Sequence, residues 1–171
     1  QAISQVLKPT AKGMVAEKRP FQGILYAGLI QTATGPKVIE FNARFGDPET
    51  QVVLARLESP LSEIISSLLA KEQPTIVWNE LASVGVVVAA EGYPNQYKTN
   101  LPLPEMSGET IYYAGVTRSE QALVSAGGRI FLAEATASTL EEARKKVYQT
   151  LDNYSFPGMY YRKDIGVKGL I

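Results

Sequence analysis

Cysteine and histidine are both absent from this sequence of 171 residues. Without cysteine, a disulfide framework and thiolate metal sites are excluded. Without histidine, the commonest general base and any imidazole metal ligand are missing. Tryptophan occurs once, and no apolar run is long enough to span a bilayer. Phosphate or carboxylate chemistry on a magnesium ion needs neither cysteine nor histidine.

An excess of charge of one sign is also lacking, because 17 Lys and Arg side chains balance 17 Asp and Glu side chains. This balance gives no indication of a nucleic acid partner or an anionic membrane surface. The sequence starts at Gln1 without a basic and then apolar leader, so we expect a soluble cytoplasmic protein. A chain of this length can bury a real core in one domain or two.

The stretch from Lys37 to Gln51 is the centre of the sequence-based prediction. Its first six residues have the β-branched and aromatic character of a strand. Side chains alternate across a strand, so Val38, Glu40 and Asn42 are expected on one face, with successive members roughly 6.5–7 Å apart. The Glu40 carboxylate and the Asn42 amide oxygen can converge on one small cation. Both are hard oxygen donors, and Mg²⁺ combines such donors with waters and substrate phosphates.

A turn and a helix are expected directly after this strand. Arg44 is a fixed cation suited to phosphate or carboxylate. Gly46 allows a turn, and Asp47-Pro48 predicts a helix with Asp47 as N-cap and Pro48 at the first position, running to about Leu57. A phosphate or carboxylate ligand could thus bind Arg44 beside the proposed metal ligands Glu40 and Asn42.

Turn signals and periodicity predict the other elements. A strand at 24–30 should pair antiparallel with 37–42 through the turn Thr34-Gly35-Pro36. An amphipathic helix should begin at Pro60, with Ser59 as N-cap. The remaining expected elements are a helix at 1–7 ended by Pro9, a loop at 12–20, strands at 84–89, 111–113 and 129–135, a loop at 91–109, a tight turn at 127–128, and a helix opened by the capping box Thr139-x-x-Glu142.

The run Ile39-Glu40-Phe41-Asn42-Ala43-Arg44-Phe45-Gly46-Asp47-Pro48-Glu49-Thr50-Gln51 closely resembles a signature of the phosphoribosylamine–glycine ligases, ATP-grasp enzymes of purine biosynthesis. The Glu-x-Asn core is shared by many ATP-grasp enzymes, whereas the Arg-Phe-Gly-Asp-Pro-Glu-Thr-Gln extension is specific. The resemblance extends over nearly the whole chain, through residues 8–10, 23–29, 92–94, 114–115, 127–129 and 158–166.

The resemblance implies an α+β fold in two parts. Residues 1–72 would form the C-terminal part of an ATP-grasp fold, an antiparallel sheet plus helices. Residues 73–171 would form a small β-rich C-terminal domain with a helix. A full-length member would carry an N-terminal domain and most of the ATP-grasp region before Gln1. The sequence is therefore expected to be a fragment that is inactive alone.

The resemblance also implies a reaction and its ligands. ATP would phosphorylate the carboxylate of glycine, and the amine of 5-phosphoribosylamine would attack the resulting glycyl phosphate. The products are glycinamide ribonucleotide, ADP and phosphate. ATP and Mg²⁺ (or Mn²⁺) would be the cofactors. Glycine, 5-phosphoribosylamine and the N-terminal part of the same enzyme would be the partners, with no nucleic acid and no membrane.

Residue roles follow from the same match. Glu40 and Asn42 would hold the metal, and Arg44 would be a catalytic group that also binds substrate. Asp47 and Glu49 are candidate substrate contacts. Helix capping would equally explain Asp47, and a favourable interaction with the helix dipole would equally explain Glu49. Two further residues, Leu29 and Ile30, are candidate contacts of the adenine ring and equally good core residues.

Two departures and two alternatives belong to this interpretation. Many ATP-grasp enzymes have a second metal carboxylate on the preceding strand, and that position falls near Gly28 in this sequence. Phosphoribosylamine–glycine ligases resemble this chain in lacking the second carboxylate. Tyr113 stands where the family usually has His. We expect the side chain at this position to pack within the C-terminal domain. The competing functions are another ATP-grasp ligase and a non-catalytic interaction module with a relict metal site.

Overall fold

The computed structural model describes residues 2–106, 110–120 and 122–170. It contains two compact units, Gln1–Thr50 and Gln51–Ile171. Both combine helices with antiparallel strands, so the predicted α+β class is confirmed. The first unit ends well before residue 72, where the sequence suggested a domain boundary, and that boundary stays a prediction.

The N-terminal helical region is longer than predicted. A π-helical segment, η1 (Ile3–Leu7), runs directly into α1 (Lys8–Ala16), so the helix does not end before Pro9 and residues 12–16 are not loop. Pro9 lies in the first turn of α1, where its missing N–H removes no helical hydrogen bond. The prediction of a break at Pro9 was wrong for that reason.

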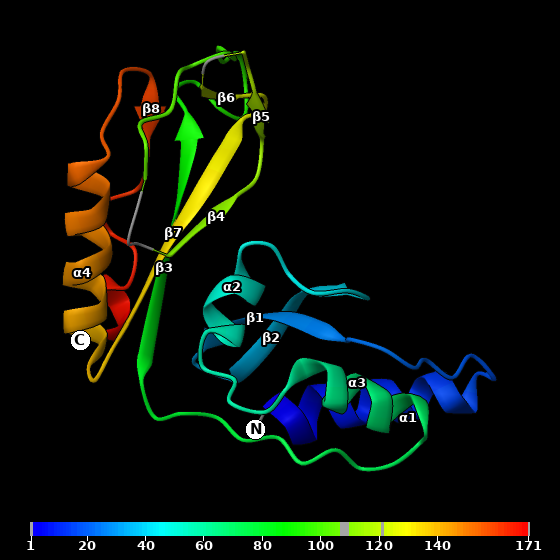
Figure 1. Cartoon of the computed structure of the whole chain (residues 1–171). Coiled ribbons are helices and arrows are strands. Elements are labelled where there is room, and N and C mark those ends of the chain that lie inside the picture. Colours follow the sequence, from blue (N-terminus) through cyan, green and yellow to red (C-terminus); the bar gives the residue numbers. More distant parts are fainter. Residues whose placement is uncertain (1, 107–109, 121, 171) are drawn as a thin grey trace. The chain divides into compact units, whose positions relative to one another are not determined.

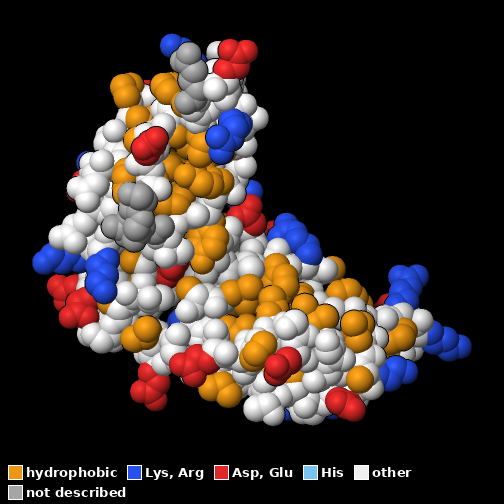
Figure 2. Space-filling model, viewed as in Figure 1, with side chains coloured by type: hydrophobic (Ala, Val, Ile, Leu, Met, Phe, Trp, Pro, Cys, Tyr) orange, Lys and Arg blue, Asp and Glu red, His pale blue; other side chains and the backbone are white. Residues whose placement is uncertain are grey.

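The predicted hairpin is confirmed, but its turn is at 33–34 and not at Thr34-Gly35-Pro36, because Gly35 and Pro36 already pair as strand. Strand β1 (Tyr26–Thr32) pairs antiparallel with β2 (Gly35–Asn42). The register shifts between Gly28, which pairs with Glu40, and Leu29, which pairs with Val38, so Ile39 is the extra residue of a β-bulge. Figure 2 shows hydrophobic side chains exposed over this hairpin, and Ile39 is 67 % exposed.

The bulge changes which side chains of β2 share a face. One face of β1 carries every second residue, namely Tyr26, Gly28 and Ile30. Their partners on β2 are Asn42, Glu40 and Lys37, in that order. Val38 pairs with Leu29 on the opposite face. The prediction that Val38 shares a face with Glu40 was therefore wrong, because strict alternation fails at a bulge.

Both helices after the hairpin begin one residue later than predicted. Helix α2 (Glu49–Leu54) follows a turn that contains Asp47 and Pro48, and Thr50 N–H donates to the Gly46 carbonyl at 3.0 Å. Helix α3 (Leu61–Leu69) has Pro60 as its N-cap. Ser59 Oγ accepts a hydrogen bond from Val77 N–H at 2.8 Å instead of capping α3.

The second unit is built on a four-stranded antiparallel sheet with the order β4-β7-β3-β8. Its strands are β3 (Ala82–Ala90), β4 (Thr110–Tyr113), β7 (Arg129–Ala137) and β8 (Met159–Tyr160). A separate two-stranded ribbon joins β5 (Val116–Arg118) to β6 (Leu123–Ser125), and a 3₁₀ turn, η2 (Val167–Gly169), lies near the C-terminus. The predicted loop at 91–109 is confirmed as far as residue 106, and 107–109 lie outside the described residues.

Helix α4 (Leu140–Asn153) covers one face of this sheet (Figure 1). Buried Val84, Val86 and Val88 of β3 form a core cluster with Val147 and Leu151 of the helix. The predicted capping box is confirmed on its first side, because Thr139 Oγ1 accepts from Glu142 N–H at 3.2 Å. The Glu142 carboxylate accepts from Ser138 Oγ at 2.6 Å and also interacts with the Thr139 backbone, as a capping box requires.

Two exposed regions of the second unit carry residues that the resemblance singled out. Tyr113 on β4 is 47 % exposed, so the expectation that it packs inside the domain was wrong. The Arg162–Asp164 ion pair, 2.7 Å between Nη2 and Oδ2, is exposed at the C-terminal turn. Helix α4 anchors the backbone of that turn, with Arg144 Nη2 donating to Lys163 O at 2.7 Å and Tyr148 Oη donating to Arg162 O at 2.7 Å. None of the described helices is long and apolar enough to cross a membrane.

Candidate functional site

The two predicted metal ligands lie together on β2. Asn42 Nδ2 donates to Glu40 Oε1 at 3.1 Å, with Glu40 exposed and Asn42 half-buried. A rotation of the Asn42 amide about its last bond would place its oxygen beside the same carboxylate. The pair therefore offers two hard oxygen donors within reach of one cation.

Gly28 lies directly across the hairpin from Glu40. A Cβ on Gly28 would meet Glu40 Cγ at 3.1 Å, tighter than ordinary van der Waals contact. The strand position that holds a second carboxylate in many ATP-grasp enzymes is thus filled by the Glu40 side chain itself. Counting along the sequence placed that position near Gly28, and in the hairpin register Gly28 is the partner of Glu40.

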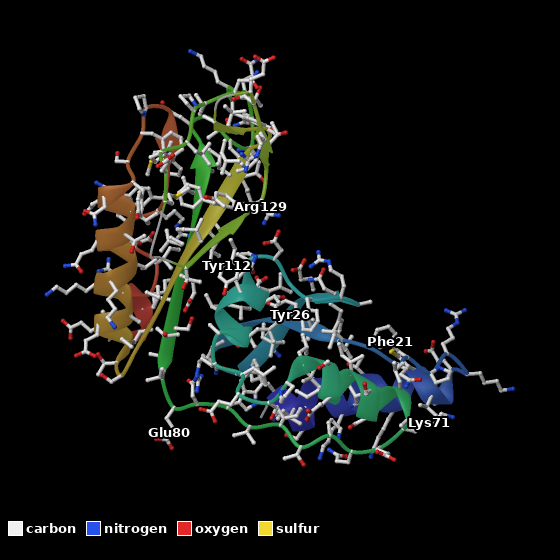
Figure 3. The ribbon with its side chains drawn as sticks, in the orientation of Figure 1. Phe21, Tyr26, Lys71, Glu80, Tyr112 and Arg129 are labelled. Atoms are coloured by element: carbon white, nitrogen blue, oxygen red, sulfur yellow. The ribbon has the colours of Figure 1, made fainter. Side chains whose placement is uncertain are left out.

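Tyr26 joins the site from the strand position opposite Asn42 (Figure 3), and the sequence-based reasoning missed it. Its hydroxyl hydrogen-bonds to Glu49. Burial raises the pKa of Tyr26, and the negative charges of Glu49 and Glu40 add to the increase. Counting two residues back from Gly28 would have revealed it, because alternation puts both on the same face.

The turn before α2 brings Glu49 back over Gly46. A Cβ on Gly46 would come within 2.5 Å of Glu49 Oε2, and Gly46 is buried. The Glu49 carboxylate therefore lies against this glycine, and its flexible end would have to shift if a Cβ were added. Glu49 thereby connects the turn to Tyr26 on β1, beside the proposed metal pair.

The other predicted site residues take less constrained positions. Arg44 is exposed, and its Nη1 donates to the neighbouring Phe45 carbonyl at 2.8 Å. Asp47 is exposed in the turn before α2. Ile30 shares the face of Glu40 and is 53 % exposed, whereas Leu29 is on the opposite face. Their roles stay predictions, and the geometry favours Ile30 over Leu29 as a nucleotide contact.

The residues present fit a magnesium ion that takes most of its ligands from elsewhere. Within the described part of the chain, no group of three or more His, Cys, Asp or Glu side chains could hold a metal. Glu40 and Asn42 supply one carboxylate and one amide oxygen. Mg²⁺ is usually bound through one or two carboxylates together with waters and substrate phosphates. The donor set therefore suits a metal–nucleotide complex better than a bare ion.

Comparison with known families assigns the class. The model described as "Phosphoribosylglycinamide synthetase, ATP-grasp (A) domain" matches residues 1–50, so the hairpin with Glu40 and Asn42 belongs to an ATP-grasp fold. The model "Phosphoribosylglycinamide synthetase, C domain" matches residues 83–168, which form most of the second unit. The chain belongs to the phosphoribosylglycinamide synthetase family.

Individual relatives agree with this assignment. Over 99 % of its length, the chain is 51 % identical to the phosphoribosylamine–glycine ligase of Halalkalibacterium halodurans and 50 % identical to that of Lactococcus lactis. The crystal structure of phosphoribosylamine–glycine ligase from Thermotoga maritima superposes with a TM-score of 0.85 at 30 % identity, over 95 % of this chain. The chain spans 41 %, 42 % and 41 % of the length of these three proteins, respectively.

Proposed function

We propose that this chain supplies the metal-holding hairpin and the C-terminal domain of a phosphoribosylamine–glycine ligase. The complete enzyme would use ATP to join glycine to 5-phosphoribosylamine through glycyl phosphate. It would release glycinamide ribonucleotide, ADP and phosphate. The proposal rests on the family membership of both units and on the relatives that carry this name.

One observation carries the assignment of the site. Glu40 and Asn42 lie within hydrogen-bond distance of each other on an exposed strand face, opposite a glycine. In this proposal they hold Mg²⁺ (or Mn²⁺), which when bound would neutralise charge on the phosphates of ATP. Gly28 adds no side chain to this face, and the Glu40 side chain lies over it.

Arg44, Asp47 and Glu49 follow the metal strand and would serve the substrates. The Arg44 guanidinium is exposed and could turn from the Phe45 carbonyl to an anionic substrate group, which it would orient and stabilise as charge develops. Glu49 is held by Tyr26 at the same end of the hairpin. The proposed reaction requires no side-chain nucleophile.

The experiment is a titration of the full-length ligase that carries these residues. We expect Glu40→Gln and Asn42→Leu to weaken Mg-ATP binding about tenfold or more, because the first removes the negative charge of the metal-directed carboxylate and the second removes an oxygen donor. Glycine-dependent ADP release should fall as well. The fold should remain, since Glu40 is exposed and Asn42 only half-buried. Isothermal titration and circular dichroism measure binding and folding.

Glu17→Gln is the matched control, because Glu17 is an exposed carboxylate at the end of α1, outside the proposed site. It should leave Mg-ATP binding unchanged. Normal binding and turnover in both Glu40→Gln and Asn42→Leu would refute the metal assignment. Nucleotide binding without any glycine-dependent turnover in the unaltered protein would favour a non-catalytic module.

A further inference from the structure

Lys37 is placed on the metal face of the hairpin by the bulge at Ile39. Strict alternation would send Lys37 to the face opposite Glu40, because the two are three residues apart. The extra residue removes this mismatch, and Lys37 pairs with Ile30, which shares its face with Gly28. The face therefore carries a cation that the sequence pattern assigned to the other side.

The Lys37 ammonium has no competing partner in the described part of the chain. It makes no hydrogen bond or ion pair there, and its residue is exposed. Glu40, the nearest carboxylate on the face, is hydrogen-bonded to Asn42. A lysine ammonium is a compact point charge with three donors on a flexible stem, well suited to a phosphate.

Three cross-strand pairs follow one another along this face. Lys37 and Ile30 form one end, Glu40 and Gly28 the middle, and Asn42 and Tyr26 the other end. Ile30 is two residues from Gly28, roughly 6.5–7 Å along β1. A phosphate chain whose metal is held by Glu40 and Asn42 would therefore extend over Lys37 in one direction.

The substrate end of the face can be identified from its other residues. Glu49 hydrogen-bonds to Tyr26, and Arg44 is two residues beyond Asn42 in the chain. The phosphate that reacts with a carboxylate must lie at that end. The nucleoside then lies at the opposite end, over the exposed side chain of Ile30.

The geometry points to Lys37 as a positioning residue that holds the phosphates nearest the nucleoside and so sets the direction of the nucleotide on the hairpin. This inference rests on the proposed function, because it requires a nucleotide at the metal pair. Both ATP and the product ADP keep the phosphates that Lys37 would contact. Lys37 should therefore serve substrate and product nucleotide equally.

The test measures binding of Mg-ATP, Mg-ADP and adenosine to the full-length ligase by isothermal titration. Lys37→Met should raise the Kd of ATP and of ADP by the same factor, about tenfold, and leave that of adenosine within about twofold. Lys37→Arg should keep most of the affinity. Lys12→Met is the control, since Lys12 is an exposed lysine of α1 far along the sequence from the hairpin; it should bind all three ligands normally.

Three results would overturn the inference. Unchanged binding of ATP and ADP would remove Lys37 from the site. An equal loss for adenosine would indicate damage to the hairpin or a contact with the ring. Weaker binding of ATP alone would put Lys37 at the reacting phosphate. If Glu40→Gln weakens Mg-ATP binding and Lys37→Met does not, only this inference fails; if neither does, the proposed function fails with it.

Discussion

Glu134 is a carboxylate enclosed in the middle of β7, only 7 % exposed. Its neighbours in the sheet register are Gly85 on β3 and Thr110 on β4. Ser83 Oγ donates to Glu134 Oε1 at 2.8 Å. Burial raises the pKa of Glu134, and the Ser83 hydrogen bond only partly opposes this. The folded protein therefore binds a proton at Glu134 more tightly than the unfolded chain does.

This raised pKa predicts a pH-dependent effect of Glu134→Gln. Below the unfolded-state pKa the carboxyl is neutral in both states, so the substitution should change little. As the pH rises through the folded-state pKa, the charged carboxylate destabilises the fold. Gln stays neutral and keeps an oxygen for Ser83, so the variant should gain on the order of 1 kcal/mol at neutral pH. Urea unfolding from about pH 4 to about pH 8 measures this.

Glu58→Gln is the control for Glu134→Gln, because Glu58 is an exposed carboxylate of the same unit. It should show no comparable gain. A gain at Glu134 that is equally large in acid and at neutral pH would mean that the effect is packing rather than ionisation.

Helices α1 and α3 end in the same way, each with a lysine in the left-handed region (Lys71 is labelled in Figure 3). Lys18 has φ of 59° and Lys71 has φ of 62°. After Lys71, Glu72 N–H donates to the Ser67 carbonyl at 2.8 Å, the hydrogen bond that closes a Schellman motif. Glycine is the usual residue at such a position, because a Cβ is unfavourable there.

Lys71→Gly should therefore stabilise the second unit. We expect a gain of roughly 0.5–1 kcal/mol, the difference between the relieved backbone strain and the larger entropy of glycine in the unfolded chain. Thermal unfolding measures it. Lys71→Ala separates the backbone from the charge, since it removes the ammonium and keeps the Cβ. Equal gains in both variants would show that the charge, and not the φ angle, was unfavourable.

The sequence predicted the longer elements because each buries one face with a clear period. The continuous apolar run at 84–89 and the capping box at Thr139 are local signals, and the structure has a strand with Val84, Val86 and Val88 buried at the first and a capped helix at the second. Strands β5, β6 and β8 have two or three residues each, too few to show a period. The bulge at Ile39 escaped prediction because it depends on the register of two strands, and the β2 sequence alone fits regular alternation.

At the scale of the whole molecule, the candidate site is an exposed surface of the hairpin. Glu40 and Arg44 are exposed, and the chain spans 41 % of the length of the H. halodurans relative. No stretch of the sequence resembles the glycine-rich loop and the lysine-bearing strands that would cover the phosphates from the other side. The Glu-x-Asn motif predicted that Glu40 and Asn42 converge. The pairing register of β1 and β2 added Tyr26 and Lys37 to the site, and no local sequence pattern indicates these two residues.

Residues 1–171 alone should therefore have no ligase activity. We expect Mg-ATP to bind no tighter than roughly millimolar, about −4 kcal/mol, because exposure to water weakens each ionic contact. Isothermal titration of the purified chain, beside an assay of glycine-dependent ADP release, tests both statements. Micromolar binding or measurable turnover would contradict this prediction and show that the missing part of the enzyme is dispensable.

The contact between Gly28 and Glu40 limits how such a site can change during evolution. A second carboxylate at position 28 would add a Cβ only 3.1 Å from Glu40 Cγ. The first carboxylate would have to move before the second could be accommodated. A one-carboxylate site of this kind thus becomes a two-carboxylate site only when the Glu40 side chain shifts by a few tenths of an ångström.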